Sequence, residues 1–324
     1  MKKTQIIILY ILTVLLTGCI HQYPGEVEDT TQVNVAIDVE IDSSLPVYQG
    51  ISRATDTGQK RRFIIDVYQD GKVIAEKRIL TTKAEQTGQG RYSIPLPMKL
   101  HAREYTFVVW NDYVEEDTGS DLHFNAADLT NVSLNELYHP DYRQREAFCG
   151  VAQADFTSYK DEESAQVRQH IFLKRPQAKF RIISADTEEF ITRAHTRRDR
   201  ESDYRVTLGY EYFLPTAYDV AGGVLCDSKP GVRFTAPCNI EADAEGKCEL
   251  ASDFVFVGTD ASHVTVTLEV TDGEGKVISR VTGVKVPVKQ GHLTTVTGNF
   301  LTTLMQPGVS IDPGYEGEFD ITIP

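Results

Sequence analysis

The segment Val33-Asn-Val-Ala-Ile-Asp-Val-Glu-Ile41 places an apolar residue at every second position, with polar residues or alanine between them. Successive side chains of a β-strand point to opposite faces of the sheet. This alternation therefore predicts a strand with one buried face. The segment favours an all-β chain whose folded part begins at Val33.

Similar runs recur through the rest of the sequence. Residues 63–68 and 73–80 flank Asp70-Gly71, and an Asp-Gly pair between β-rich runs is the strongest short signal for a hairpin. Residues 105–110 form a compact run that holds the only tryptophan. The remaining strands are expected at residues 171–174, 178–183, 204–213, 254–257, 264–270, 277–288, 293–301 and 319–323.

Other segments depart from the regular strand pattern. Residues 94–100 alternate, but Pro95 and Pro97 cannot donate to a β-ladder, so we expect an edge strand or an extended segment there. The further departures are an acidic, turn-rich segment at 111–121 and short helices at 128–136 and 186–193, the latter capped by Asp186.

Many short strands with almost no helix predict β-sandwiches. A chain of 324 residues exceeds what one small core usually holds, so two domains are expected. Arg175-Pro176 separates a short strand from the next one, which makes it the expected boundary. We predict an N-terminal sandwich over 33–175, a C-terminal sandwich over 176–302 and a C-terminal extension over 303–324.

The N-terminus is typical of a bacterial lipoprotein signal. Lys2 and Lys3 precede an apolar run over 6–16, which is too short to span a bilayer, and the run ends in Leu16-Thr-Gly-Cys19. This lipobox predicts a signal peptide over 1–18, cleavage between Gly18 and Cys19, and acylation of Cys19. The alternative is an ordinary signal peptide that happens to contain a cysteine. The acidic segment over 19–32 would then be an acylated tether that links the protein to a membrane.

The composition restricts the partners. The formal net charge is −14, which argues against nucleic acid and against polybasic binding of anionic lipids. Apart from Cys19, four cysteines remain: Cys149, Cys226, Cys238 and Cys248. Cys238 and Cys248 flank a turn-rich stretch, so a disulfide between them across a hairpin is one expectation, and four thiols are the other.

The sequence contains no recognisable catalytic or metal-binding motif. The histidines are scattered without zinc-ligand spacing, and neither a nucleophile elbow nor a phosphate-binding loop is present. We therefore predict no catalytic residue, no metal site, no cofactor and no enzymatic activity.

Five further stretches, together with the lipobox, resemble the fimbrillin-type lipoproteins of Bacteroidia, most closely the minor, anchor-like subunits of the fimbrium. The stretches are Tyr105-Thr-Phe-Val-Val-Trp-Asn-Asp-Tyr113, Asp121-Leu-His-Phe-Asn-Ala-Ala-Asp-Leu129, Ala147-Phe-Cys-Gly150, Leu173-Lys-Arg-Pro-Gln-Ala-Lys-Phe-Arg181 and Leu293-Thr-Thr-Val-Thr-Gly298. The resemblance implies two tandem transthyretin-like β-sandwiches, an outer-membrane lipoprotein displayed at the cell surface, and other fimbrium subunits as partners.

A fibre of this kind can be built by β-strand addition, in which an edge strand of one subunit completes the sheet of another. Phe319, Ile321 and Ile323 give the C-terminal segment one apolar face, so it is a candidate donor strand; the alternative is that it folds back on its own domain. Stalk subunits of the family are processed after an arginine, which makes Arg53 a candidate site, although an ordinary loop arginine is the simpler interpretation.

A different function also remains open at this point. Exposed aromatic residues could bind a glycan or a host protein without any fibre, and the candidates are Tyr113, Tyr138, Tyr142 and Tyr159. The same tyrosines could equally pack inside the sandwiches.

Overall fold

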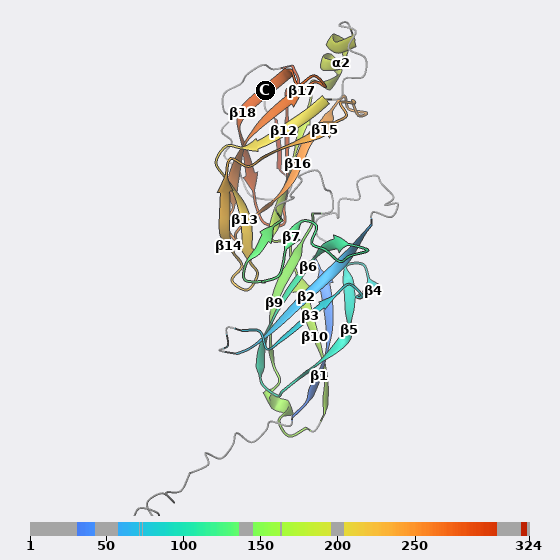
Figure 1. Cartoon of the computed structure of the whole chain (residues 1–324), viewed down its shortest axis with the longest axis vertical. Coiled ribbons are helices and arrows are strands. Elements are labelled where there is room, and N and C mark those ends of the chain that lie inside the picture. Colours follow the sequence, from blue (N-terminus) through green and yellow to red (C-terminus); the bar gives the residue numbers. More distant parts are fainter. Residues whose placement is uncertain are drawn as a thin grey trace, which may run out of the picture.

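The computed structural model describes residues 31–42, 58–70, 72, 74–135, 145–162, 164–195, 204–302 and 319–322. In these ranges nearly all of the regular secondary structure is β-strand, which confirms the predicted all-β, multi-sheet class. Figure 1 shows two lobes stacked along the long axis of the molecule. The signal peptide, Gly18, Cys19, Arg53, Tyr138, Tyr142 and Ile323 lie outside the described residues.

The lower lobe in Figure 1 is a sandwich of two four-stranded sheets. One sheet has the order β10-β1-β5-β4, in which β1 runs parallel to β10 and antiparallel to β5. The other has the order β3-β2-β6-β9 and is antiparallel throughout. The strands are β1 (Val33–Ile41), β2 (Gln59–Gln69), β3 (Lys77–Thr81), β4 (Glu85–Gly88), β5 (Arg91–Leu100), β6 (Glu104–Glu115), β9 (Phe148–Asp155) and β10 (Ala165–Leu173).

The alternation in β1 works as the sequence predicts. Its five apolar residues are buried and the residues between them are half-buried. They pack against a shared core that includes Phe63, Phe107, Phe148 and Ile171, each at most 1% exposed. Burying a side chain of this size stabilises the fold by about 1.5–3 kcal/mol, so β1 is integral to the lower lobe.

The upper lobe repeats the two-sheet plan. Its sheets have the orders β16-β11-β19-β20 and β15-β12-β17-β18, with a separate core between them. A single α-helix among the described residues, α2 (Thr187–His195), follows β11, close to the predicted 186–193. The strands are β11 (Gln177–Ser184), β12 (Tyr204–Tyr210), β15 (Arg233–Cys238), β16 (Cys248–Phe256), β17 (Ser262–Thr271), β18 (Val277–Val288), β19 (Leu293–Gly298) and β20 (Phe319–Thr322).

A fifth sheet joins the lobes, and the sequence did not predict it. Its order is β14-β13-β8-β7. The strands β7 (Phe124–Asn125) and β8 (Val132–Leu134) come from the first half of the chain, while β13 (Phe213–Asp219) and β14 (Val224–Pro230) come from the second. Ala217 pairs with Ser133 and Tyr218 with Val132. The two halves therefore share backbone hydrogen bonding, and their folding as separate units stays a prediction.

The helix expected at 128–136 is wrong. Residues 129–130 form a turn and β8 follows directly. Asp128 accepts hydrogen bonds at its Oδ1 from the N–H and the hydroxyl of Thr130, at 2.9 and 2.8 Å. Such local bonds compete with helix formation. The segment at 111–121 is also less turn-like than expected, because β6 continues to Glu115.

The proline segment 94–100, expected as an edge strand or an extended segment, belongs to β5 and pairs with β1 on one side. Its prolines are accommodated by an irregularity: Ile94 pairs with Ile37 and Met98 with Val35, so Pro95 and Pro97 fall opposite a bulge. On the other side β4 pairs only with residues 91–93, so among the described strands the proline segment lies at an edge there, as expected. Neither proline therefore removes a ladder hydrogen bond.

In the Ala147-Phe-Cys-Gly150 stretch, position 150 leaves no room for a side chain. A Cβ at this position would lie 2.4 Å from the backbone oxygen of Phe172 and 2.9 Å from a methyl group of Leu173. β9 thus crosses close to β10 at the corner where the two lower sheets meet.

We expect Gly150→Ala to lower the free energy of unfolding by about 1–3 kcal/mol, because overpacking forces the backbone apart. Urea denaturation measures the change. Gly258→Ala is the matched control: its added Cβ meets no atom within 4 Å, so the change should stay within about 1 kcal/mol. Equal stability of the two variants would contradict the close approach.

No helix among the described residues is long and apolar enough to cross a membrane.

Candidate functional sites: the terminal edge and the junction between the lobes

The C-terminal strand lies at the edge of its own upper-lobe sheet. β20 pairs in parallel with β19, so that Phe319 is opposite Thr294 and Ile321 is opposite Val296. No strand of the described chain lies on its outer side. Of the two arrangements left open by the sequence, the structure shows the intramolecular one.

The chain is fixed just before residues 303–318, which connect β19 to β20. The carboxylate of Asp186 accepts the backbone N–H of Thr302 at 2.7 Å, its hydroxyl at 2.6 Å, and the N–H of Leu301 at 3.2 Å. Burial acts to raise the pKa of Asp186, but these bonds and the Ser184 hydroxyl hold that pKa below its usual value. The charged carboxylate therefore anchors the start of the connection at neutral pH, and its contribution to stability is lost as the pH falls through the lowered pKa.

The second candidate site is the junction between the lobes. It has its own apolar core with Trp110 at the centre, whose ring lies 5.4 Å from that of Phe124 and 6.5 Å from that of Phe256. Tyr218 stacks on Phe256 at 5.8 Å. The buried members are Ile64, Val108, Trp110, Phe124, Ala126, Leu129, Val132, Ala147, Cys149, Tyr218, Val220 and Phe256.

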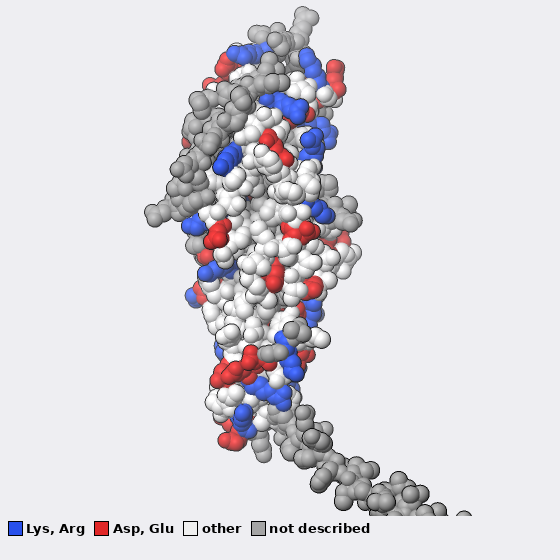
Figure 2. All heavy atoms as spheres, turned by 90° about the vertical axis from the view of Figure 1, so that its left-hand side faces the viewer, with Lys and Arg blue, Asp and Glu red and all other residues white. Residues whose placement is uncertain are grey.

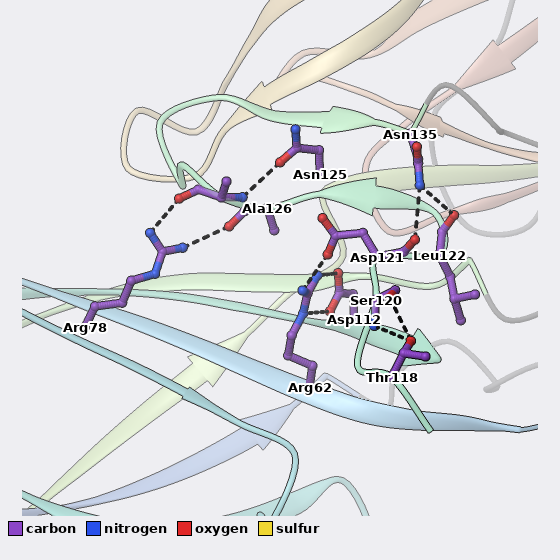
Figure 3. A network of polar contacts seen from close by, with 11 residues as sticks. Arg62, Arg78, Asp112, Thr118, Ser120, Asp121, Leu122, Asn125, Ala126 and Asn135 are labelled. Atoms are coloured by element: carbon purple, nitrogen blue, oxygen red, sulfur yellow. Dashed lines mark hydrogen bonds and ion pairs between the residues drawn. The ribbon is translucent and has the colours of Figure 1, made fainter. Parts of the chain in front are cut away.

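A polar network holds the connection that carries β7 and β8 against the lower lobe, as Figure 3 shows. Arg62 on β2 forms a two-bond pair with Asp112 on β6, at 2.8 and 2.6 Å, and reaches Asp121 at 2.6 Å. Arg78 on β3 donates to the carbonyls of Ala126 and Ala127 at 2.9 and 2.6 Å. These bonds fix the connection before and after β7.

A short buried segment, Arg145–Ala147, which we call the polar strip for its two charged side chains, lies between the lobes. Arg145 forms an ion pair with Asp253 on β16, and both side chains are at most 1% exposed. The hydroxyl of Tyr210 donates to the second carboxylate oxygen of Asp253 at 2.7 Å.

The rest of the strip is bonded to the chain segment that leads from β10 to β11. Glu146 pairs with Arg175 at 3.0 Å, and the N–H of Ala147 donates to Gln177 at 3.1 Å. The strip therefore joins the end of the lower lobe to two strands of the upper one.

The predicted hairpin between Cys238 and Cys248 is wrong. Cys238 ends β15 and Cys248 begins β16, and these strands belong to different sheets. The two side chains nevertheless lie close together, and hydrogen bonding from Cys238 lowers the pKa of the Cys248 thiol. The disulfide between them stays a prediction.

The remaining candidate cysteine and tyrosines among the described residues pack against other side chains of the fold. Burial raises the pKa of the Cys149 thiol to about 12, so this cysteine is a poor nucleophile. Tyr113 is stacked on Arg61 at 4.7 Å, and Tyr159 packs on the lower core. No cluster of metal ligands occurs among the described residues.

Sequence reasoning missed the junction because its parts are far apart in the chain. Arg145 and Asp253 are separated by 108 positions. No local pattern in the sequence around either residue indicates the pair.

Comparisons with known proteins place the chain as follows. Residues 24–324 match the model of a family of unknown function, DUF6562. No curated protein matches the sequence.

The solved structures that are similar to the chain include two fimbrial proteins. The fimbrial anchor protein Mfa2 from Porphyromonas gingivalis is 13% identical, with 76% of this chain and 81% of that chain covered and a TM-score of 0.40. A fimbrial assembly protein from Parabacteroides distasonis is 9% identical, with 82% and 90% covered and a TM-score of 0.41. Because both TM-scores lie below 0.5, we infer function from this chain's own residues.

Proposed function

The chain belongs to the family of unknown function DUF6562, and we propose that it is a lipid-anchored surface protein that serves as an anchor or accessory subunit of a fimbrium. In this proposal the lipid at Cys19 holds the protein in the outer membrane, and other fimbrium subunits are bound by β-strand addition. The protein contributes to adhesion through the fibre and carries out no reaction.

The observation that carries the proposal is the position of β20. It is a four-residue strand at the outermost position of a sheet, and its pairing with β19 is parallel. Parallel pairing is slightly less stable per residue than antiparallel pairing, and a short edge strand adds little stability. The same strand could therefore leave its own sheet and complete the sheet of a neighbour.

The arrangement of the ends supports an anchoring role. Figure 1 places the start of β1 at the lower end of the molecule and β20 in the upper lobe. A lipid ahead of β1 and a partner at β20 would thus act on opposite lobes. The junction, with its shared sheet and buried ion pairs, lies between them and would transmit a pulling force without a flexible linker.

Deleting residues 315–324 tests this role. We expect the melting temperature of the protein to change little, because only a short edge strand is lost, while incorporation into fibres falls strongly. Incorporation is measured by immunogold labelling of fibres on cells and by co-purification of the other subunits. A substitution on the opposite side of the lobe, such as Arg205→Ala, is the control and should leave both unchanged.

Loss of the folded upper lobe in the deletion variant would contradict the proposal. β20 would then belong to the core of its own lobe, and assembly would have to use another edge. Normal incorporation of a folded deletion variant would contradict it as well.

A further inference from the structure

A cavity of about 650 Å³ lies at the junction, away from the terminal edge. One wall comes from β7, β8 and their connection, and the other from β13, β14 and β15, so both halves of the chain contribute to it. Its volume falls in the usual range of ligand-binding sites. Its lining residues are Asn125, Asn131, Ser133, Leu134, Asn135, Leu214, Thr216, Ala217, Asp227, Lys229, Val232, Arg233 and Phe234.

One residue of the cavity lining carries a buried hydroxyl that lacks a bonding partner. Thr216 on β13 is 6% exposed, and its Oγ1 makes no hydrogen bond to any described residue. An unpaired buried hydroxyl costs stability, and a native protein retains one chiefly where something else satisfies it. A bound ligand with hydroxyl groups would do so.

The other lining groups suit a ring with both polar and apolar faces. The side-chain oxygen of Asn125 accepts the N–H of Ala127 at 3.1 Å, which leaves its amide N–H groups for another acceptor. Leu214, Val232 and Phe234 supply apolar surface. Amides and hydroxyls that converge next to an apolar wall match the chemistry of a sugar ring.

The two positively charged side chains of the lining favour a ligand that carries a negative charge. Lys229 and Arg233 line the cavity, are exposed, and have no carboxylate within ion-pair distance among the described side chains. The one acid in the lining is Asp227, whose Oδ1 accepts the N–H of Ser228 at 2.7 Å. Lys229 and Arg233 are therefore available to an anion bound in the cavity.

Figure 2 shows the side of the molecule that lies to the left in Figure 1, where β13 and β14 are found. Acidic and basic side chains are interspersed there over a largely uncharged surface. No broad field of one sign covers this face, so recognition of an anion has to come from individual side chains.

We propose that this cavity binds an acidic saccharide, in which Lys229 and Arg233 pair with the carboxylate of the sugar, while Thr216 and the amide N–H groups of Asn125 bond its hydroxyls. Charge-assisted bonds from arginine are about twice as strong as neutral ones, so the carboxylate contributes much of the affinity. Because both halves of the chain line the cavity, the ligand also stabilises the junction.

The test is isothermal titration calorimetry on the detergent-solubilised mature chain. The probes are trigalacturonate and sialyllactose, which carry the carboxylate on sugars of different origin, with lactose as the neutral match and inorganic phosphate as the anion control. We expect saturable binding of at least one acidic probe, weaker binding of lactose by about tenfold or more, and no competition by phosphate.

Two substitutions and a control sharpen the result. Arg233→Ala should weaken binding by about tenfold or more, whereas Arg205→Ala removes a cation on the neighbouring β12 and should change nothing. Thr216→Val keeps the shape and removes the unpaired hydroxyl, so it should weaken binding while the melting temperature of the ligand-free protein stays equal or rises.

The proposal is overturned if neither acidic probe binds, if lactose or phosphate binds as well as the acids, or if Arg233→Ala binds normally. None of these outcomes bears on fibre incorporation, which depends on the terminal strand.

Discussion

An Arg145→Met variant should unfold with a free energy lower by about 3–5 kcal/mol, because it leaves Asp253 charged and buried without its cationic partner. Neither side chain is exposed beyond 1%, so water cannot replace the lost ion pair. Methionine fills a similar volume, which separates the electrostatic loss from a packing loss. Urea denaturation followed by tryptophan fluorescence suits the measurement, since Trp110 lies in the junction core.

Two further variants decide the cause of this loss. Arg168→Met removes a cation that pairs with Asp38 at 2.6 Å but is 66% exposed, and it should cost less than about 1 kcal/mol. Arg145→Met combined with Asp253→Asn removes the stranded charge and keeps an acceptor for Tyr210, so it should recover part of the stability. If Arg145→Met cost no more than Arg168→Met, the buried pair would not stabilise the junction.

A Cys19→Ala variant should be released from membranes completely. Without its thiol the lipobox cannot be acylated, and the acyl chains are the proposed membrane attachment, each buried methylene contributing about 0.8 kcal/mol. Membrane fractionation with a palmitate label measures both effects at once.

Cys226→Ala is the matched control for this variant. Its thiol is exposed on β14, so the substitution should leave labelling and fractionation unchanged. Unchanged membrane association of Cys19→Ala would contradict anchoring through a lipid at Cys19.

The strands that bury one face could be predicted from the sequence. β1 and β18 have the predicted bounds, since apolar residues on their inner faces repeat with the period of a strand. β14 was missed because all seven of its residues are exposed and no alternation marks it. β9 was missed because its outer half carries only small residues, Ala152 and Ala154, on the inner face.

The junction could not be predicted, for a different reason. Ser133 and Ala217 pair across the lobes although 84 positions separate them. No pattern in the sequence around either residue indicates that it pairs with the other. The terminal strand is the intermediate case: its alternation predicted a strand, and the choice between its own sheet and a neighbour's depends on free energies that a local pattern does not contain.

The central claim is that β20 can bind the edge of β19 from a separate chain. The most direct measurement is fluorescence anisotropy of a labelled peptide of residues 315–324 added to a chain that ends at Thr302, with an Ile321→Asp peptide as the control. We predict saturable binding of the native peptide to the truncated chain, weak binding of the control peptide, and little binding to the full-length chain, whose edge its own β20 occupies. A truncated chain that is folded but does not bind the native peptide would contradict assembly through this edge.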